Sequence, residues 1–160
     1  MADLQKLARA IIDSNLYMTL GTADEDGRPW VSPVYYAADA YRDFFWISSP
    51  EATHSGNIAK RPELGIVVFD SQQPAGTGEA VYMTAVGEEL ADDEVERGLE
   101  VYPGPADRGG RPMEPADVRP PSPYRLYRAR VSEHSMLCPR DGGPCAEHGL
   151  AFDHRTTVVL

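Results

Sequence analysis

Cysteine and positive charge are both scarce in this 160-residue sequence. Two cysteines, Cys138 and Cys145, are too few for the disulfide framework of a small secreted protein, and we expect both to be reduced thiols. The 15 lysines and arginines are outnumbered by 25 aspartates and glutamates, which gives a formal net charge of −10 at pH 7. Because nucleic acids and anionic membranes repel such a chain, we expect neither as a partner.

Long apolar runs are also missing. The longest ones have the length of a strand and fall far short of the roughly 20 residues that a membrane-spanning helix needs. Residues 1–15 form an amphipathic pattern without the apolar block and cleavage site of a signal peptide. We therefore expect a cytoplasmic protein with no membrane segment.

Several motifs that carry chemistry are absent from the sequence. No G-x-G-x-x-G follows a predicted strand, and neither a P-loop nor a G-x-S-x-G elbow is present. A metal site would have to combine the two cysteines with His134 and His148, and their spacing matches no common zinc pattern. A disulfide would need an oxidising compartment, which nothing else indicates. We expect no metal, and the sequence leaves the catalytic residues unknown.

The best-defined stretch, residues 44–70, predicts a strand, a short helix and a second strand. Residues 44–47 are aromatic and β-branched, which suits a half-buried strand. Pro50 is well placed to open a helix, and Pro62 ends it. Residues 64–69 (LGIVVF) form a second run typical of a strand.

Polar groups gather where the first of these strands passes into the helix. Ser48, Ser49 and Thr53 bring hydroxyls, His54 brings an imidazole that would be a cation when protonated, and the helix N-terminus brings amide donors. This combination is suited to binding a phosphate. The alternative for Ser48 and Ser49 is simple helix capping, and for His54 a solvated surface histidine.

The rest of the chain predicts more strands and two more helices. Helical spacing after Asp3 predicts a helix that ends near residues 14–15, and a short acidic helix is expected at 92–102. Further strands are expected at 16–22, 28–36, 80–89, 124–131 and 155–160.

Three connecting regions are predicted to be irregular. Residues 37–43 are expected to form a hairpin loop, and the tail from Ser132 to the last strand is expected to be irregular. Residues 103–123 are rich in proline and glycine and predict an unpacked surface excursion.

Pro33 cannot donate to a strand ladder, so its strand is predicted to lie at an edge or to contain a bulge. Strands joined by hairpins, with helices at the margins, predict one mainly β domain over residues 1–160, an antiparallel barrel with flanking helices.

This order of segments resembles the pyridoxamine 5′-phosphate oxidase-like, FMN-binding split-barrel family. The likeness rests on LYMTLGTADEDGRPWVSPVYY, FFWISSP, EATHSGNIAKRPE, LGIVVF and VYMTAVGEE in that order, and it is best over residues 4–90. The resemblance implies a six-stranded antiparallel split β-barrel. It also implies a homodimer that binds one flavin in each of two clefts between the subunits.

The resemblance also implies where the flavin binds. In the family, contacts come from the second strand, the end of the third strand and the start of the next helix. Together with Ser49, from the phosphate argument, and Asn57, one turn after His54, the candidate residues are Ser32, Pro33, Val34, Tyr35, Tyr36, Ile47, Ser48, Ser49, Thr53, His54 and Asn57. The alternatives are a surface position for Asn57 and core or interface positions for the aromatic residues.

The sequence departs from the family pattern at several positions. Ser32, Thr53 and His54 stand where arginine, arginine and lysine would be expected, and Ala80 replaces a glutamine. The substrate-binding Arg-x-His near the C-terminus has only residues 153–155 (DHR) as a counterpart. We therefore do not expect pyridoxamine 5′-phosphate to be the substrate.

Three functional hypotheses follow from the resemblance. The first is an oxidoreductase that transfers a hydride between FMN and a small organic substrate. The second is a non-catalytic flavin-binding protein that uses the same cleft. The third is a deazaflavin-dependent reductase of the same fold, against which the acidic character of the chain argues mildly. Some relatives bind haem instead.

Overall fold

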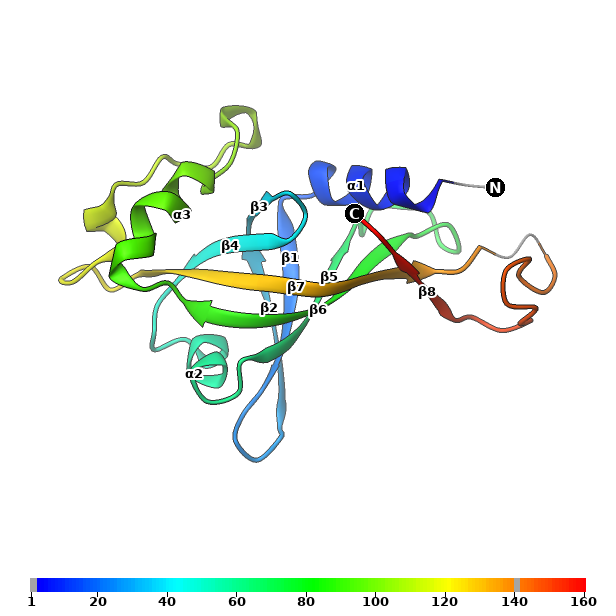
Figure 1. The fold of residues 1–160 in the computed structure, drawn as a ribbon, viewed down its shortest axis with the longest axis horizontal. Coiled ribbons are helices and arrows are strands. Elements are labelled where there is room, and N and C mark those ends of the chain that lie inside the picture. The colour runs from blue at the N-terminus through cyan, green and yellow to red at the C-terminus, as the bar shows by residue number, and fades with distance from the viewer. Residues whose placement is uncertain (1–2, 140–141) are drawn as a thin grey trace.

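Alternating apolar residues produce one curled sheet in the computed structural model, which describes residues 3–139 and 142–160 (Figure 1). In this part of the chain eight strands pair, all antiparallel, in the order β2-β1-β5-β6-β7-β4-β3, with β8 added to β7. Their bounds are β1 Tyr17–Ala23, β2 Pro29–Tyr35, β3 Ala37–Asp39, β4 Asp43–Ser48, β5 Glu63–Phe69, β6 Ala80–Glu89, β7 Arg125–Leu137 and β8 Arg155–Val158. The mainly β, antiparallel fold class is confirmed: the predicted last strand is present as β8, and the short β3 was not predicted.

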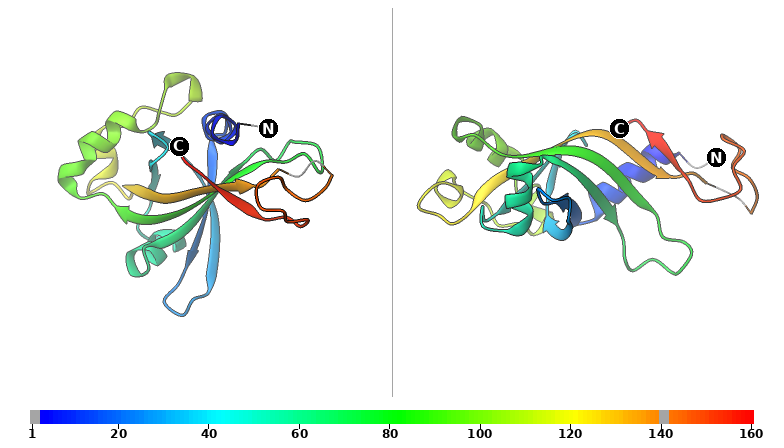
Figure 2. Two further views of the ribbon diagram at one scale, coloured as in Figure 1. Left: turned by 45° about the vertical axis from the view of Figure 1, so that its right-hand side comes forward. Right: turned by 90° about the horizontal axis from the view of Figure 1, so that it is seen from below.

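Three α-helices flank the sheet in the described part of the chain: α1 Leu4–Ser14, α2 Thr53–Lys60 and α3 Val95–Val101. The carboxylate of Asp3 accepts a hydrogen bond from the backbone amide of Lys6 and caps α1, as predicted. Helix α1 lies along one side of the curved sheet (Figure 2). None of these helices has the length and the apolar character that crossing a membrane requires.

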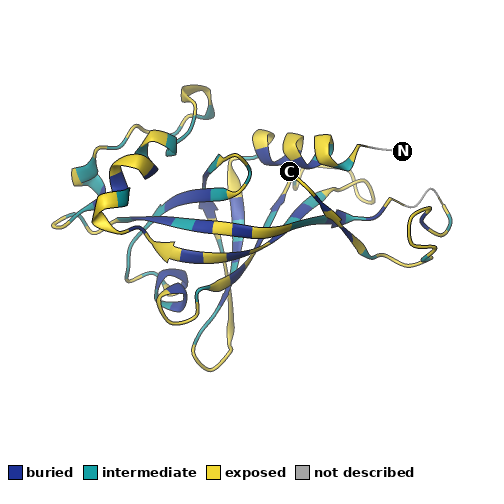
Figure 3. Cartoon of the chain, in the orientation of Figure 1, coloured by how far each residue is buried: buried dark blue, intermediate teal, exposed yellow. Residues whose placement is uncertain are grey.

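The sheet is buried on both of its faces where β4 pairs with the first half of β7. The inner face carries the main core, whose largest fully buried side chains include Phe44, Trp46 and Met18. Phe45 and Leu126 point to the outer face, where they form a second apolar cluster with Leu90, Val95 and Val118. Figure 3 shows the buried residues along the strands, whereas the tip of the β1–β2 hairpin is exposed.

The predicted surface excursion, residues 103–123, packs against the body of the protein. It contains the 3-10 helices Ala106–Arg108 and Pro115–Val118. Val118 is only 1% exposed, and Arg108 donates to three backbone carbonyls at 2.9–3.1 Å, those of Asp13, Asn15 and Tyr36. The prediction of an unpacked segment was wrong because the segment carries its own apolar anchor and its own guanidinium donor.

Three boundaries also differ from the predictions. The expected loop at 37–43 contains β3, and its reversal is made by Ala40 and Tyr41, both at positive φ. Helix α2 begins at Thr53 instead of Pro50, because the Ser49 side chain and carbonyl first hold a turn. Strand β7 continues to Leu137, since pairing with β6 and β8 orders residues that sequence alone left irregular.

Two glycines in helices provide a matched test of core packing. A Cβ on Gly98 of α3 would lie 2.7 Å from the Cδ atoms of Leu90 and Leu126, whereas a Cβ on Gly56 of α2 would meet nothing within 4 Å. Both Gly→Ala changes gain about 1 kcal/mol of helix propensity. Only Gly98→Ala also incurs overpacking, at about 1–3 kcal/mol.

We therefore expect Gly98→Ala to be less stable than Gly56→Ala by about 1–3 kcal/mol in urea unfolding. Because helix propensity is the same in both variants, their difference isolates the packing of the second cluster. Equal free energies of unfolding would contradict the close packing of α3 on β7.

Candidate cofactor site

The open N-terminus of α2 is the centre of the candidate site. Strand β4 ends at Ser48, and after a short turn the N-cap position of α2 is held by Ala52, whose side chain has no acceptor for the first helical amides. These amides and the helix dipole together favour an anion. Thr53, the first residue of the helix, is exposed beside them.

Ser48 and His54 form the polar pair next to this helix end. The Ser48 Oγ and His54 Nε2 atoms are 2.9 Å apart and hydrogen-bonded. His54 is 9% exposed, and burial lowers its pKa below the ordinary value of 6.5. Its ring is therefore neutral at neutral pH, so it acts as a hydrogen-bonding group and not as the cation that the sequence suggested.

Two other candidates near α2 take part in internal hydrogen bonds. Ser49 Oγ accepts from the backbone amide of Glu51, which is the turn-capping role that the sequence left open. Asn57 is 6% exposed and donates from Nδ2 to Thr22 Oγ1 at 3.0 Å. This buried bond ties α2 to β1, and Asn57 is not a surface residue.

The candidates on β2 divide between the two ends of the strand. At the end near α2, Ser32 Oγ accepts from the Trp30 indole at 2.8 Å. Tyr35 lies five residues beyond Trp30, about 17 Å along the strand, and donates its hydroxyl to the carbonyl of Pro103. Tyr36 is 1% exposed and donates to the carbonyl of Ile12, and burial raises its pKa to about 12.

The remaining candidates offer backbone groups more than side chains. Val34 is buried in the core, Pro33 is exposed on the opposite face of β2, and Ile47 packs against the second cluster. Strand β2 ends the strand order, so its outer edge is unpaired within the described chain, as predicted from Pro33. The structure thus places Ser48, Thr53 and His54 together and keeps Tyr35 and Tyr36 at a distance.

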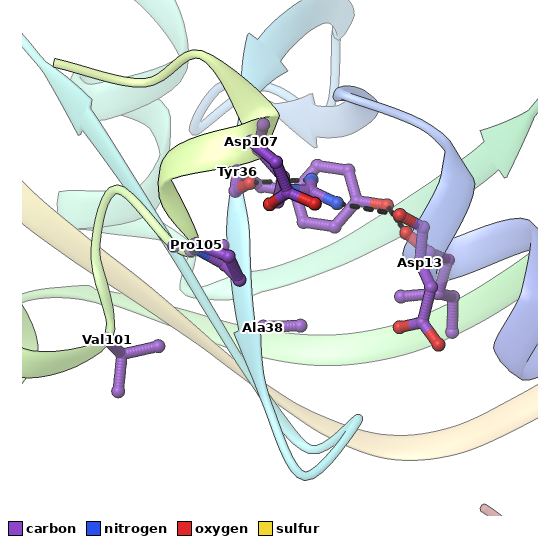
Figure 4. Close-up of a pocket in the computed structure, with 10 residues that line it drawn as sticks. Asp13, Tyr36, Ala38, Val101, Pro105 and Asp107 are labelled. Carbon is purple, nitrogen blue, oxygen red and sulfur yellow. Dashed lines mark hydrogen bonds between the residues drawn. The ribbon is translucent and has the colours of Figure 1, made fainter.

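A cavity of about 300 Å³ lies at the far end, next to Tyr36 (Figure 4). Its charged lining consists of the carboxylates of Asp13 and Asp107 and the guanidinium of Arg108, which already donates to three carbonyls. Because the two carboxylates outnumber the one guanidinium, this lining would not attract a phosphate. The helix end at α2 is therefore the better anion site in this chain.

Sequence reasoning did not single out Arg125. Arg125 on β7 is the register partner of Ser48 on β4, so both side chains point to the same face of the sheet. Its side chain is 22% exposed and lies 3.6 Å from a carboxylate oxygen of Glu89. No local signal could have revealed this, because the register of two strands 77 positions apart is a tertiary property.

The model of one protein family, described as pyridoxamine 5′-phosphate oxidase, matches residues 4–138. A heme binding protein from Mycobacterium smegmatis shares the fold with a TM-score of 0.68 at 20% identity, over 98% of this chain and 59% of that one. The heme storage protein from Vibrio cholerae shares the fold with a TM-score of 0.60 at 17% identity, over 82% of this chain and 92% of that one. An F420 reductase shares it with a TM-score of 0.56 at 20% identity, over 79% of this chain and 94% of that one. No curated protein matches the chain.

These comparisons confirm the resemblance and the split-barrel fold class. At such identities the solved structures show a shared fold alone. The three proteins differ in what their names say they bind or do, so the fold by itself does not select a cofactor.

The lowered pKa of His54 predicts a pH dependence of stability. Below its ordinary pKa of 6.5 the unfolded chain binds a proton that the folded chain excludes, so the free energy of unfolding falls as the pH falls through that value. We expect His54→Gln to lose less stability than the wild type between about pH 7.5 and about pH 5.5 in urea unfolding. Thr53→Ala, which changes no titratable group, should keep the wild-type slope. An unchanged slope in His54→Gln would refute the assignment.

Proposed function

Because the chain belongs to the pyridoxamine 5′-phosphate oxidase family, we propose that it is a cytoplasmic, homodimeric oxidoreductase that uses FMN to oxidise or reduce a small organic molecule. The observation that carries this proposal is the Ser48–His54 pair beside the open N-terminus of α2. Bound FMN would supply a ring that accepts or donates a hydride.

The residues around α2 fit the phosphate of FMN. The first amides of the helix and the hydroxyls of Ser48 and Thr53 offer hydrogen-bond donors without a formal charge. Arg125, the register partner of Ser48, is a cation on the same face, but Glu89 partly neutralises it. Its Nη1 already donates to the carbonyls of Ser122 and Tyr124. The site would thus hold a phosphate mainly through neutral donors, in keeping with the missing arginines and lysine at positions 32, 53 and 54.

The edge of β2 fits the polar rim of the flavin ring. Its outer backbone groups have no strand partner within the described chain, and they run from the α2 end toward Tyr35. Backbone amides and carbonyls at this edge would fix the orientation of the ring. The chain's own contribution is then binding and orientation, together with the exclusion of water.

A second copy of the chain would complete this cleft. Large apolar side chains are exposed on β1, on β2 and just before β1, with Tyr17 61% exposed, Trp30 48% and Val31 63%. Apolar side chains on adjacent strands are the usual material of a subunit interface. A partner packed there would cover the unpaired edge and enclose the ring.

We propose that pyridoxamine 5′-phosphate is not the substrate. The family's C-terminal Arg-x-His has only residues 153–155 (DHR) as a counterpart, and in the structure His154 lies beside the thiol of Cys145 and Arg155 lies over the ring of Tyr82. A deazaflavin-dependent reductase is the second candidate, favoured by the shared fold of an F420 reductase.

We expect purified protein to take up FMN saturably and Ser48→Ala to bind it more weakly. Loss of a hydrogen bond to a charged group costs about 1.5–3 kcal/mol, or a roughly 10- to 100-fold rise in Kd. The measurement is a titration followed by flavin absorption and fluorescence quenching, with Ser71→Ala in the exposed 70–79 loop as the matched control. Uptake of a deazaflavin but not FMN would select the second candidate, and uptake of neither would refute both.

We expect Val31→Asp to convert a dimer into a monomer in analytical ultracentrifugation, because a buried unpaired carboxylate is costly. Val159→Asp is the matched control, since Val159 is 73% exposed and lies near the C-terminus, away from β2. If the wild type is monomeric at the concentration at which it binds FMN, the intersubunit cleft is ruled out.

A further inference from the structure

The tail of the chain brings two cysteines and two histidines together at the far end of β7. Cys138 follows β7 directly, Cys145 and His148 lie in the connection to β8, and His154 immediately precedes β8. One ligand atom from each of the four lies within 4.8 Å of all the others. Both thiols are free and buried, with Cys138 7% and Cys145 2% exposed.

Three of four distances between these atoms match those of a tetrahedral metal site, and the fourth, between Cys145 Sγ and His154 Nε2, is shorter. Zinc bonds sulfur at about 2.3 Å and nitrogen at about 2.0–2.1 Å, so tetrahedral angles separate sulfur from nitrogen by about 3.6 Å and nitrogen from nitrogen by about 3.3 Å. In the structure, His148 Nδ1 lies 3.6 Å from each thiol sulfur, and His154 Nε2 lies 3.2 Å from Cys145 Sγ. The two ring nitrogens are 3.3 Å apart.

A backbone group orients His154 with its ligand nitrogen toward the cluster. The other ring nitrogen of His154, Nδ1, is 2.9 Å from the carbonyl of Phe152. Such a partner selects the tautomer whose lone pair faces the metal, and it is typical of a histidine ligand. The other nitrogen of His148, Nε2, is 3.9 Å from a carboxylate oxygen of Glu147, which is a nearby charge and not a hydrogen-bond partner. The Cys145 sulfur also accepts from the backbone amide of His148 at 3.1 Å, as a thiolate ligand does.

We propose that Cys138, Cys145, His148 and His154 bind one zinc ion. Two thiolates and two imidazoles in a tetrahedral arrangement match the softness and the geometry that zinc prefers. The four protein ligands leave no open position, so the site is structural and has no catalytic role.

The ion would anchor the last strand of the sheet. Its ligands lie at both ends of the connection between β7 and β8, where the amide of Cys138 also donates to the carbonyl of His154. Apart from hydrogen bonds, the described part of this connection has few apolar contacts to hold it, since most of its residues are exposed. Zinc would close the loop and fix the register of β8 against β7.

The sequence predicted no metal because the spacing of its cysteines and histidines matches no common zinc pattern, and because His134 was considered instead of His154. His134, which we considered with the cysteines, lies within β7 and bonds through Nε2 to the carbonyl of Tyr41 at 2.7 Å. His154 takes the position instead. The resulting Cys-x6-Cys-x2-His-x5-His spacing matches no common zinc pattern, and only the fold reveals the set.

The full-length protein, purified with reductant and without chelator, should contain one zinc per chain by elemental mass spectrometry. After removal of the metal, Co²⁺ should produce the visible bands of a tetrahedral site and the charge-transfer band of a thiolate ligand, and added zinc should displace the Co²⁺ and abolish these bands. We expect Cys145→Ser and His154→Gln each to weaken Co²⁺ binding more than about 100-fold, beyond the loss seen when a group that only orients a ligand is removed. His134→Gln is the matched control and should bind as the wild type does.

A second readout separates loss of the site from loss of the fold. Hydrogen exchange should show β8 amides losing protection when zinc is removed from the wild type, while α2 amides keep theirs. Three results would overturn the proposal: a reduced wild type that binds neither Co²⁺ nor zinc, unchanged binding in both ligand variants, or a Cys138–Cys145 disulfide that persists in reductant. None of these measurements requires a flavin, so they are independent of the proposed function.

Discussion

The pairing of β4 with β7 is the constraint on which the rest of the structure depends. Along this pairing the sheet is buried on both faces: Trp46 stacks on Tyr127 inside the sheet, with ring centroids 5.5 Å apart, while Phe45 and Leu126 pack outside it. Because side chains alternate along a strand, a register slip of one residue would exchange the two apolar sets. The register is therefore fixed, and it places Ser48 opposite Arg125 at the end of both strands.

The pairing of β4 with β7 determines the geometry of the candidate cofactor site. Ser48 is the last residue of β4, and the turn held by Ser49 delivers the chain into α2 so that His54 returns to the Ser48 hydroxyl. On its other side α2 is tied to β1 through the buried bond from Asn57 to Thr22. A helix held at both sides keeps its first amides in a fixed direction, which a phosphate site requires.

The sequence predicted the structure correctly wherever the deciding signal lies in a few neighbouring residues. The Asp3 cap, the β5 and β6 runs and the edge, one of the two predictions made from Pro33, all depend on a few neighbouring residues, and the structure has each of them. The errors arose where distant segments decide. The 103–123 segment is ordered by contacts of Arg108 with residues more than 70 positions away, and β7 is lengthened by its partners. Within the candidate site, the sequence predicted that Ser48 and His54 lie close together. It could not predict that His54 is neutral, because that depends on burial.

Strand β7 connects the candidate cofactor site and the proposed zinc site without making one depend on the other. At about 3.3 Å per residue its 13 residues span about 43 Å, with Arg125 near α2 at one end and Cys138 just beyond the other. The end near α2 is fixed by apolar packing on both faces, whereas the end near β8 has β6 and β8 as partners and a connection of mostly exposed residues. Burial of apolar surface can stabilise the first end by itself. In the connection from β7 to β8, where most described residues are exposed, a coordinate bond would provide a constraint that apolar packing does not supply.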